Sequence, residues 1–254
     1  MDLEGRAAIV TGGGTGVGAA TAMRLARLGC RVLVNYSRSK EAAEAVAAEA
    51  SEQGAAAFAY KADVSDDADC RDLVGAATKE FGRLDVLVNN AGTTKFVAHD
   101  NLEGITSEDW DEILGVNLKG AFFCSRAARA ALNDGDGGEI VMTSSVAGLA
   151  GTGSSIAYCA SKAGLNNLTV TLARVLAPRT RVNAVAPGFI DGSWLADGFG
   201  EAYDGIKKAF EDRAPLKRVC KPDDVAAAIL GVITGPDLVT GHVLPIEGGV
   251  LIAS

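Results

Sequence analysis

The chain has 254 residues, of which 48% are hydrophobic, enough to bury a sizeable core in one large α/β domain or two small ones. Its 24 basic and 32 acidic residues leave a net charge of −8, which disfavours nucleic acid as a partner because the phosphate backbone is also negative. The five cysteines are scattered without a Cys-x-x-Cys pair, and no signal peptide or run of about 18 apolar residues occurs, so we expect a cytoplasmic protein with neither a metal site nor a membrane partner.

Short β-branched runs alternate with longer helical patterns along the chain. Most of the runs are continuously apolar, which is typical of parallel strands covered on both faces. The alternation predicts one doubly wound α/β domain of the Rossmann type over residues 1–254, with a seven-stranded, mostly parallel sheet and helices on both faces. The predicted strands are 7–11, 31–35, 57–61, 84–88, 139–144, 181–185 and 243–246, and two of the predicted helices are 39–53 and 66–81.

A glycine-rich turn follows the first predicted strand. Thr11-Gly12-Gly13-Gly14-Thr15-Gly16-Val17-Gly18 leads directly into an Ala-rich helix. Glycines permit a tight turn and close backbone approach, and the helix N-terminus offers N–H groups and a positive dipole end to a diphosphate. Its position between strand and helix favours a dinucleotide-binding loop over a merely flexible connection.

The stretch after the second predicted strand bears on the choice of cofactor. A carboxylate there would accept hydrogen bonds from the adenosine ribose of NAD, but residues 34–40 contain no acid. Ser37 and Arg38 could instead hold a 2′-phosphate, because a guanidinium matches phosphate geometry. The sequence favours NADP(H) and leaves NAD(H) open, since Arg38 and Lys40 could also simply decorate a helix start.

Hydroxyl side chains, Ser144 and Ser145, follow the fifth predicted strand at the edge where open α/β sheets hold ligands. Further on, Tyr158 and Lys162 lie four residues apart, on one face of a predicted helix. A nearby ammonium and a nicotinamide cation would lower the pKa of Tyr158 from about 10 toward the range useful for acid–base catalysis. Ser145 could hydrogen-bond the substrate oxygen as charge develops on it.

Taken together, these residues resemble the short-chain dehydrogenase/reductase family over essentially the whole chain. The resemblance implies hydride transfer between a nicotinamide and a carbonyl or secondary alcohol carbon, with Tyr158 as general acid/base. It also implies that Lys162 lowers the pKa of Tyr158 and binds the nicotinamide ribose, that Ser145 polarises the substrate, and that Asn117 holds a water linking Lys162 to solvent. The motifs that carry it are Thr11-Gly12-x-x-x-Gly16-x-Gly18, Asp63-Val64, Asn89-Asn90-Ala91-Gly92, Asn117, Ser145, Tyr158, Lys162 and Pro187-Gly188.

The same resemblance implies the cofactor contacts. Asp63 and Val64 would bracket the adenine, Asn90 would lie near the adenosine ribose, and Ile190 would line the nicotinamide site. The expected cofactor-binding residues are Gly12, Thr15, Gly16, Val17, Gly18, Ser37, Arg38, Asp63, Val64, Asn90, Ala91, Gly92, Tyr158, Lys162, Pro187, Gly188 and Ile190. Two positions depart from the family pattern. Gly192, followed by Ser193, stands where a threonine is common, and Thr15 stands where NADP(H) users often carry a basic residue.

The chain also resembles one branch of the family, the 3-oxoacyl-(acyl-carrier-protein) reductases, whose substrate is delivered by an acidic carrier protein. Residues 133–139, before the fifth predicted strand, are acidic and would repel an acidic carrier, although Arg179 and Arg181 could attract one. We therefore expect a free small-molecule carbonyl or alcohol substrate. The carrier-dependent reductase and a non-catalytic NADP-binding sensor or scaffold are the alternatives. The resemblance also implies a homotetramer or homodimer.

Residues 191–218 interrupt the alternation of strands and helices and predict a substrate lid at about 190–215 in place of a second domain. Aromatic residues of this segment, and Phe96 and His99 after the fourth predicted strand, would either line a substrate pocket or anchor the lid. His99 and His242, the only histidines, are expected in loops too far apart for a metal site.

Overall fold

The seven apolar runs form one sheet with every pair of neighbouring strands parallel, in the order β3-β2-β1-β4-β5-β6-β7. This computed structural model describes residues 1–134 and 136–253, so Gly135 of the predicted acidic loop and the final Ser254 lie outside the described residues. The predicted doubly wound α/β fold is confirmed. The strands are β1 (Ala7–Val10), β2 (Arg31–Tyr36), β3 (Ala57–Lys61), β4 (Val86–Asn89), β5 (Gly138–Thr143), β6 (Thr180–Pro187) and β7 (Val243–Ile246).

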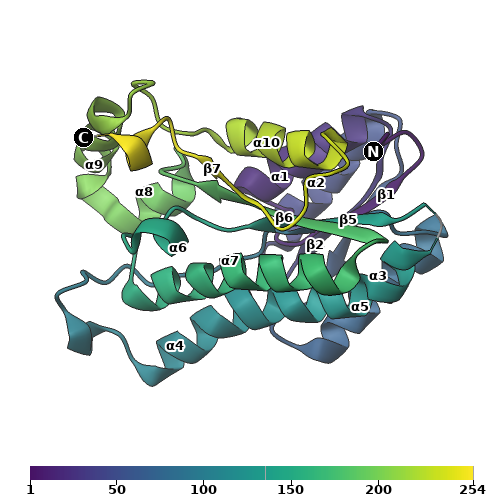
Figure 1. The fold of residues 1–254 in the computed structure, drawn as a ribbon, viewed down its shortest axis with the longest axis horizontal. Helices are drawn as coiled ribbons and strands as arrows, with labels where there is room; N and C mark the ends of the chain where they lie inside the picture. Colours follow the sequence, from purple (N-terminus) through teal and green to yellow (C-terminus); the bar gives the residue numbers. More distant parts are fainter. Residues whose placement is uncertain (135, 254) are drawn as a thin grey trace.

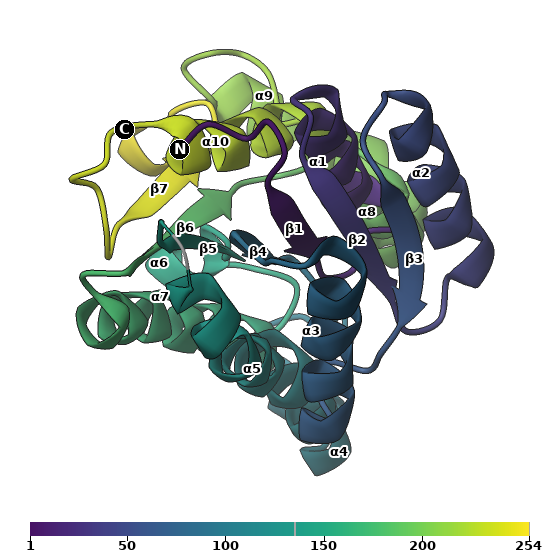
Figure 2. The ribbon, with the colours of Figure 1, turned by 90° about the vertical axis from the view of Figure 1, so that its right-hand side faces the viewer.

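Helices cover both faces of the sheet. α1, α2 and α10 lie on one face, and α3, α5 and α7 lie on the other (Figures 1 and 2). The helices are α1 (Gly16–Arg27), α2 (Lys40–Glu52), α3 (Asp67–Phe81), α4 (Ser107–Leu114), α5 (Ala121–Asn133), α6 (Ala147–Ala150), α7 (Ile156–Leu176), α8 (Ser193–Phe199), α9 (Tyr203–Arg213) and α10 (Pro222–Thr234). A π-helical turn, Gly115–Gly120, joins α4 to α5.

Two hydrophobic cores explain why the strands are apolar without alternation. Ile9 faces the core under α3, α5 and α7, whereas Val10 faces the core under α1, α2 and α10, and both side chains are fully buried. Leu87 and Val88 divide in the same way on β4. Successive strand residues point to opposite faces, so a strand covered on both sides needs an apolar residue at every position.

The predicted helix 66–81 is observed with its first residue acting as a cap. The Asp66 carboxylate accepts hydrogen bonds from the backbone N–H groups of Ala68 and Asp69, which satisfies two of the unpaired donors at the start of α3. Gly82 ends the helix at φ 73°, in the left-handed region that glycine tolerates. Local side-chain chemistry therefore sets both ends of α3.

The predicted lid segment forms α8 and α9 beyond the end of β6, at one end of the molecule (Figure 1). Phe189 stacks on Phe199 and packs against Tyr203 and Phe210, with ring centroids 5.3–6.4 Å apart. The Asp191 carboxylate pairs with Lys207 at 2.7 Å. These contacts anchor the segment to the sheet, while its role as a moving lid stays a prediction.

Asp85 ties the start of β1 to the start of β4. Its carboxylate accepts hydrogen bonds from the backbone N–H of Ala7 at 2.9 Å, from Arg6 at 3.0 Å and from Arg83 at 2.6 and 2.8 Å. Burial alone would raise the pKa of Asp85, but the hydrogen bonds from Arg83, Ala7 and Arg6 outweigh it and hold the pKa below its usual value. The folded state therefore prefers the ionised carboxylate.

We expect Asp85→Asn to lower the free energy of unfolding by about 2–3 kcal/mol at pH 7, because it leaves two guanidinium groups facing a neutral amide. The loss should shrink as the pH falls through the lowered pKa of Asp85, where the wild-type side chain itself becomes protonated. Urea denaturation of both proteins between pH 3 and pH 7 measures this difference. Asp212→Asn, which removes a surface partner of Lys208, is the control and should have a far smaller effect. An equally small effect of both substitutions would contradict the prediction.

Candidate active site

The predicted site residues gather at the carboxyl edge of the sheet. Because all seven strands are parallel, the loops that follow them open at the same edge. The structure therefore brings together Gly12–Gly18 after β1, Ser37 and Arg38 after β2, Asp63 and Val64 after β3, Asn90–Gly92 after β4, Ser145 after β5 and Pro187–Ile190 after β6. Asn117, Tyr158 and Lys162 reach this edge from helical segments.

The glycine-rich loop packs too closely for side chains. A Cβ atom on Gly18 would lie 2.2 Å from the carbonyl oxygen of Gly12, so α1 rests directly on the loop backbone. Gly12 has φ 59°, and its N–H donates to the side chain of Asn35 at 3.2 Å. Asn35 was missed by the sequence prediction, although it is the one strongly polar side chain in the buried middle of β2, which is the signal that could have found it.

The loop fits a diphosphate on two observations. Thr15 is the cap residue of α1, but within the described residues its side chain accepts no hydrogen bond from the backbone N–H groups of the helix. The first N–H groups of α1 can therefore donate to an anion. Gly16, with φ 53°, has open space where a side chain would begin. Backbone donors, a helix dipole and room beside them are the features that a dinucleotide needs.

Thr11 joins the glycine-rich loop to the turn after β4. Its hydroxyl donates to the carbonyl of Val88 and accepts from the backbone N–H groups of Asn90 and Ala91 at 2.9 and 3.0 Å. The side-chain amide of Asn90 donates back to the carbonyls of Thr11 and Gly12 at 3.1 and 3.2 Å. Asn90 thus holds the loop in place, and its contact with a ribose stays a prediction.

The residues expected at the adenosine end lie on neighbouring loops. Ser37 and Arg38 are exposed at the end of β2, with 89% of the Arg38 side chain accessible. Asp63 accepts hydrogen bonds from the backbone and hydroxyl of Ser65, and Val64 is buried against the π-helical turn. Their positions permit the predicted contacts with adenine and ribose, which stay predictions.

Tyr158 and Lys162 share one face of α7, beside Ser145. The ammonium of Lys162 lies 5.6 Å from the centre of the Tyr158 ring and donates to the carbonyl of Thr143 at 2.7 Å. Ser145 lies close enough to Tyr158 to lower its pKa, and its hydroxyl accepts from the backbone N–H of Ala147 at 3.1 Å and donates to the carbonyl of Pro187 at 3.5 Å. The helix starts at this point because the Ser155 hydroxyl caps the N–H of Tyr158. The predicted trio is therefore assembled as the sequence pattern indicated.

The expected lowering of the Tyr158 pKa is wrong for the protein by itself. Burial raises the pKa of Tyr158 to about 12, and the hydrogen bond with Ser145 offsets only part of this. Burial also lowers the pKa of Lys162 to about 8, because only 4% of the residue is accessible. The prediction counted the attraction between the two charges and missed desolvation, which disfavours both charged forms.

Asn117 lies in the π-helical turn, a distortion that is frequent at functional sites. Its side-chain oxygen accepts from the N–H of Thr93 at 2.8 Å, and its amide donates to the Thr93 carbonyl and the Ser161 hydroxyl, both at 3.0 Å. A methyl group on Gly92 would lie 3.5 Å from this oxygen and 3.8 Å from the Lys162 nitrogen. Asn117 therefore adjoins Lys162, and the water between Lys162 and solvent stays a prediction.

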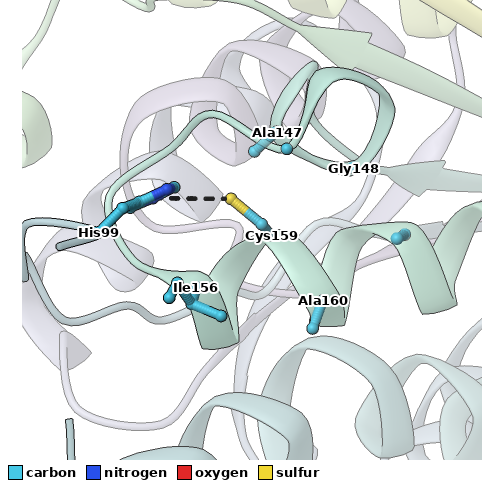
Figure 3. A pocket seen from close by; sticks show the side chains of 8 residues that line it. His99, Ala147, Gly148, Ile156, Cys159 and Ala160 are labelled. Carbon is cyan, nitrogen blue, oxygen red and sulfur yellow. Dashed lines mark hydrogen bonds between the residues drawn. The ribbon is translucent and has the colours of Figure 1, made fainter. Parts of the chain in front are cut away.

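A hollow of about 360 Å³ is lined by residues of α6 and of the first turns of α7, among them Ala147 and Cys159 (Figure 3). The Nε2 atom of His99 lies 3.0 Å from the carbonyl oxygen of Gly153 and 4.0 Å from the sulfur of Cys159. His99 is thus a half-buried loop residue that lines the hollow. Within residues 1–134 and 136–253, no cluster of three or more His, Cys, Asp or Glu side chains is placed to hold a metal. None of the described helices is both long and apolar enough to cross a membrane.

Trp194 of the predicted lid packs edge-on against the Tyr158 ring, with centroids 6.3 Å apart, and remains 48% exposed. Phe96 contacts Phe199 at 5.0 Å. The sequence left open whether these aromatics line a pocket or anchor the lid. Phe189, Phe199 and their neighbours anchor it, whereas Trp194 packs against the Tyr158 ring and stays about half exposed.

Gly188 and Ile190 complete the edge after β6. A Cβ atom on Gly188 would lie 2.8 Å from the Cβ of Glu247, so only glycine fits where this loop crosses the segment after β7. The carbonyl of Pro187 accepts the N–H of Val146, which fixes the loop next to Ser145. Ile190 is half-buried and pairs with Cys220 in an isolated bridge. Pro187 thus lies next to the Ser145 loop, and the contact of Pro187, Gly188 and Ile190 with a nicotinamide stays a prediction.

Comparison with known proteins gives a consistent result over the whole chain. A family model described as enoyl-(acyl carrier protein) reductase matches residues 12–251. A protein of Streptomyces violaceoruber, named as a candidate ketoacyl reductase 2 of the granaticin polyketide synthase, is 42% identical over 246 residues, 97% of this chain and 96% of its own length.

The 3-oxoacyl-(acyl-carrier-protein) reductase of Staphylococcus epidermidis is 36% identical over 247 residues, 96% of this chain and 98% of that protein. The structure of NAD⁺-bound xylitol dehydrogenase superposes with a TM-score of 0.89 at 29% identity and covers 98% of this chain and 100% of its own. These relatives span the glycine-rich loop, the Tyr158 helix and the lid segment alike.

We expect Lys162→Met to raise the free energy of unfolding by about 2 kcal/mol at pH 7. Removing a buried charge gains more than the lost hydrogen bond to Thr143 costs. Between the folded pKa of about 8 and the ordinary 10.5, the unfolded wild-type chain binds more protons, so wild-type stability rises with pH. The advantage of the variant should therefore shrink from pH 8 to pH 10.5 in urea denaturation. Lys61→Met, at an exposed position of β3, should show no such trend. A loss of stability independent of pH would contradict the prediction.

Proposed function

The chain belongs to the short-chain dehydrogenase/reductase family and is a nicotinamide-dependent oxidoreductase of small-molecule carbonyls and alcohols; from this premise we propose that Ser145, Tyr158, Lys162 and Asn117 catalyse the reaction, with NADP(H) as preferred cofactor. One observation carries the proposal: the Lys162 ammonium lies 5.6 Å from the centre of the Tyr158 ring, and Ser145 lies close enough to lower the pKa of the same tyrosine. When bound, the nicotinamide gives or accepts the hydride.

In the reductive direction, Tyr158 gives its phenolic proton to the substrate oxygen as the carbonyl carbon gains hydride. Burial raises the pKa of Tyr158 to about 12, so the phenol holds this proton at neutral pH and can serve as the acid. Ser145 hydrogen-bonds the same oxygen and polarises it. Lys162, 5.6 Å from the ring centre, supplies the positive charge that stabilises the phenolate left behind. Asn117 anchors the loop at Thr93 to α7 and so keeps Lys162 and Gly92 together.

The cofactor would lie across the carboxyl edge of the sheet. The amides at the start of α1 would hold its diphosphate, Asp63, Val64 and Asn90 its adenosine, and Pro187, Gly188 and Ile190 its nicotinamide. Arg38 would hold the 2′-phosphate of NADP(H), supported by its exposed guanidinium at the end of β2.

The proposed substrate is a free carbonyl or alcohol compound. The acidic stretch before β5 gives the choice of a free substrate no support, because its described residues, 133–134 and 136–139, lie at the opposite edge of the sheet from Tyr158. Arg181 was expected to attract an acidic carrier, but its largely buried side chain forms an ion pair with Glu139 at 2.7 Å. The names of two relatives favour a second candidate, the reduction of 3-oxoacyl groups on a carrier protein.

We further propose a homotetramer or homodimer in the cytoplasm. Phe122 on α5 and Val170 and Val175 on α7 are large apolar side chains exposed on the outer helices, and a second subunit would cover them. All five cysteines are free thiols, which suits a reducing compartment. The segment α8–α9 would close over the substrate, with Trp194 at its face.

Tyr158→Phe should reduce turnover about a thousandfold and leave the dissociation constant of NADPH nearly unchanged, because it removes the hydroxyl that gives the proton and keeps the ring. Oxidation of NADPH, followed by absorbance with a panel of ketones, sugars and 3-oxoacyl thioesters, measures the loss. Tyr60→Phe on β3 is the matched control and should keep its turnover. Tight cofactor binding without turnover in any variant would point to the sensor or scaffold.

The substrate class is tested with one 3-oxoacyl chain presented on a small thiol and on an acyl carrier protein, alongside free ketones and sugars. We expect a free ketone or sugar to give the highest kcat/KM, because Arg181, which was expected to attract an acidic carrier, is paired with Glu139 instead. A kcat/KM at least tenfold higher for the carrier-bound thioester would reject the free-substrate proposal in favour of the second candidate.

A further inference from the structure

Arg38, the residue proposed to bind the 2′-phosphate, faces an acid that the local sequence does not reveal. Its Nη2 atom lies 3.7 Å from Oε1 of Glu112, on α4. The two residues are far apart in the sequence and meet because the loop after β2 and helix α4 border the same edge of the sheet. The Glu112 side chain is 38% exposed, so both partners of the pair contact solvent.

The neighbouring cation and the cap of α1 do not offset the negative charge of Glu112 beside Arg38. The neighbouring cation, Lys40, pairs with Glu44 one turn along α2 at 3.7 Å. Glu41 adds a further acid in the first turn of that helix. The cap residue Thr15, where a second cation would assist phosphate binding, is neutral. The adenosine end thus combines one exposed guanidinium with several carboxylates.

We propose that Glu112 is a specificity-determining residue that limits the preference for NADPH over NADH. This proposal rests on the proposed function, since Arg38 must contact the 2′-phosphate. Glu112 acts in two ways: it occupies the guanidinium that the phosphate would bind, and it repels the added negative charge. NADH carries a hydroxyl at the same place and meets neither effect.

The direction of the effect follows from the charges. A 2′-phosphate brings close to two negative charges to a surface where Glu112 already provides one within reach of Arg38. Exposed pairs are weak and screened by salt, so the expected change is a factor of about three to five and not orders of magnitude. Neutralising Glu112 should therefore tighten NADPH binding by that factor and leave NADH binding unchanged.

The test is a set of dissociation constants measured without substrate, by titrating NADPH and NADH against the cofactor's fluorescence at low salt. The proteins are the wild type, Glu112→Gln, Arg38→Gln and the double variant. Asp111→Asn is the matched control, because it removes the same charge from the neighbouring, exposed position of α4. Thermal melting of each protein confirms that it is folded.

Tighter NADPH binding in Glu112→Gln, but not in Asp111→Asn, with a smaller gain at high salt and in the Arg38→Gln background, is the expected result. Unchanged or weaker NADPH binding in Glu112→Gln would overturn the inference, as would an equal gain for NADH. If Arg38→Gln leaves NADPH binding unchanged, the proposed role of Arg38 in binding the 2′-phosphate is wrong. Weaker NADPH binding in Arg38→Gln without a gain in Glu112→Gln would reject the role of Glu112 alone.

Discussion

Parallel strand order is the constraint on which the site depends. With all seven strands pointing the same way, each loop that leaves a strand opens at one edge, whatever its place in the sequence. The glycine-rich loop and the Ser145 loop follow different strands, with β4 between them, yet they border the same space. A single antiparallel strand in the centre would have sent one of these loops to the other end of the molecule.

Desolvation then sets the chemistry of that space. Lys162 is almost fully buried and donates a hydrogen bond to the carbonyl of Thr143, and burial lowers its pKa to about 8. The same burial raises the pKa of Tyr158 to about 12. The fold therefore favours the neutral phenol and makes the nearby ammonium less stable. A negative charge on the phenol would stabilise the ammonium, while the phenolate itself would still carry the cost of burial.

Much of this could be predicted from the sequence, and the reason lies in periodicity. The runs at Ala7–Val10 and Val86–Asn89 are apolar on both faces, so their strand character and parallel setting follow from the pattern. Predicted boundaries differ from the observed ones by one or two residues, as for β6, which continues to Pro187. Ser145, Tyr158 and Lys162 were found because their order and spacing carry the resemblance to the family.

Contacts between distant segments could not be predicted in the same way. The sequence around Arg38 does not predict its contact with Glu112, and the sequence around Cys159 does not predict its contact with His99. Each pair forms only because segments distant in the sequence meet in the fold. The sign of the Tyr158 pKa depends on burial, which a motif does not encode. The motif predicts a place for Asn117 near Lys162, but the hydrogen bonds by which it links Thr93 to Ser161 could be found only from the structure.

The hydrogen bonds of Thr11 suggest that cofactor binding and substrate binding are coupled. Through Asn90 it fastens the glycine-rich loop to the turn after β4; that turn adjoins Asn117, and Asn117 bonds Ser161, whose hydroxyl donates to the Tyr158 carbonyl. Hydrogen bonds thus link the glycine-rich loop, through the turn after β4 and Asn117, to the helix α7 that carries Tyr158. If the cofactor tightens this network, substrate affinity rises, and by linkage the substrate must strengthen cofactor binding by the same factor. The two ligands would then behave as cooperative partners within a single subunit.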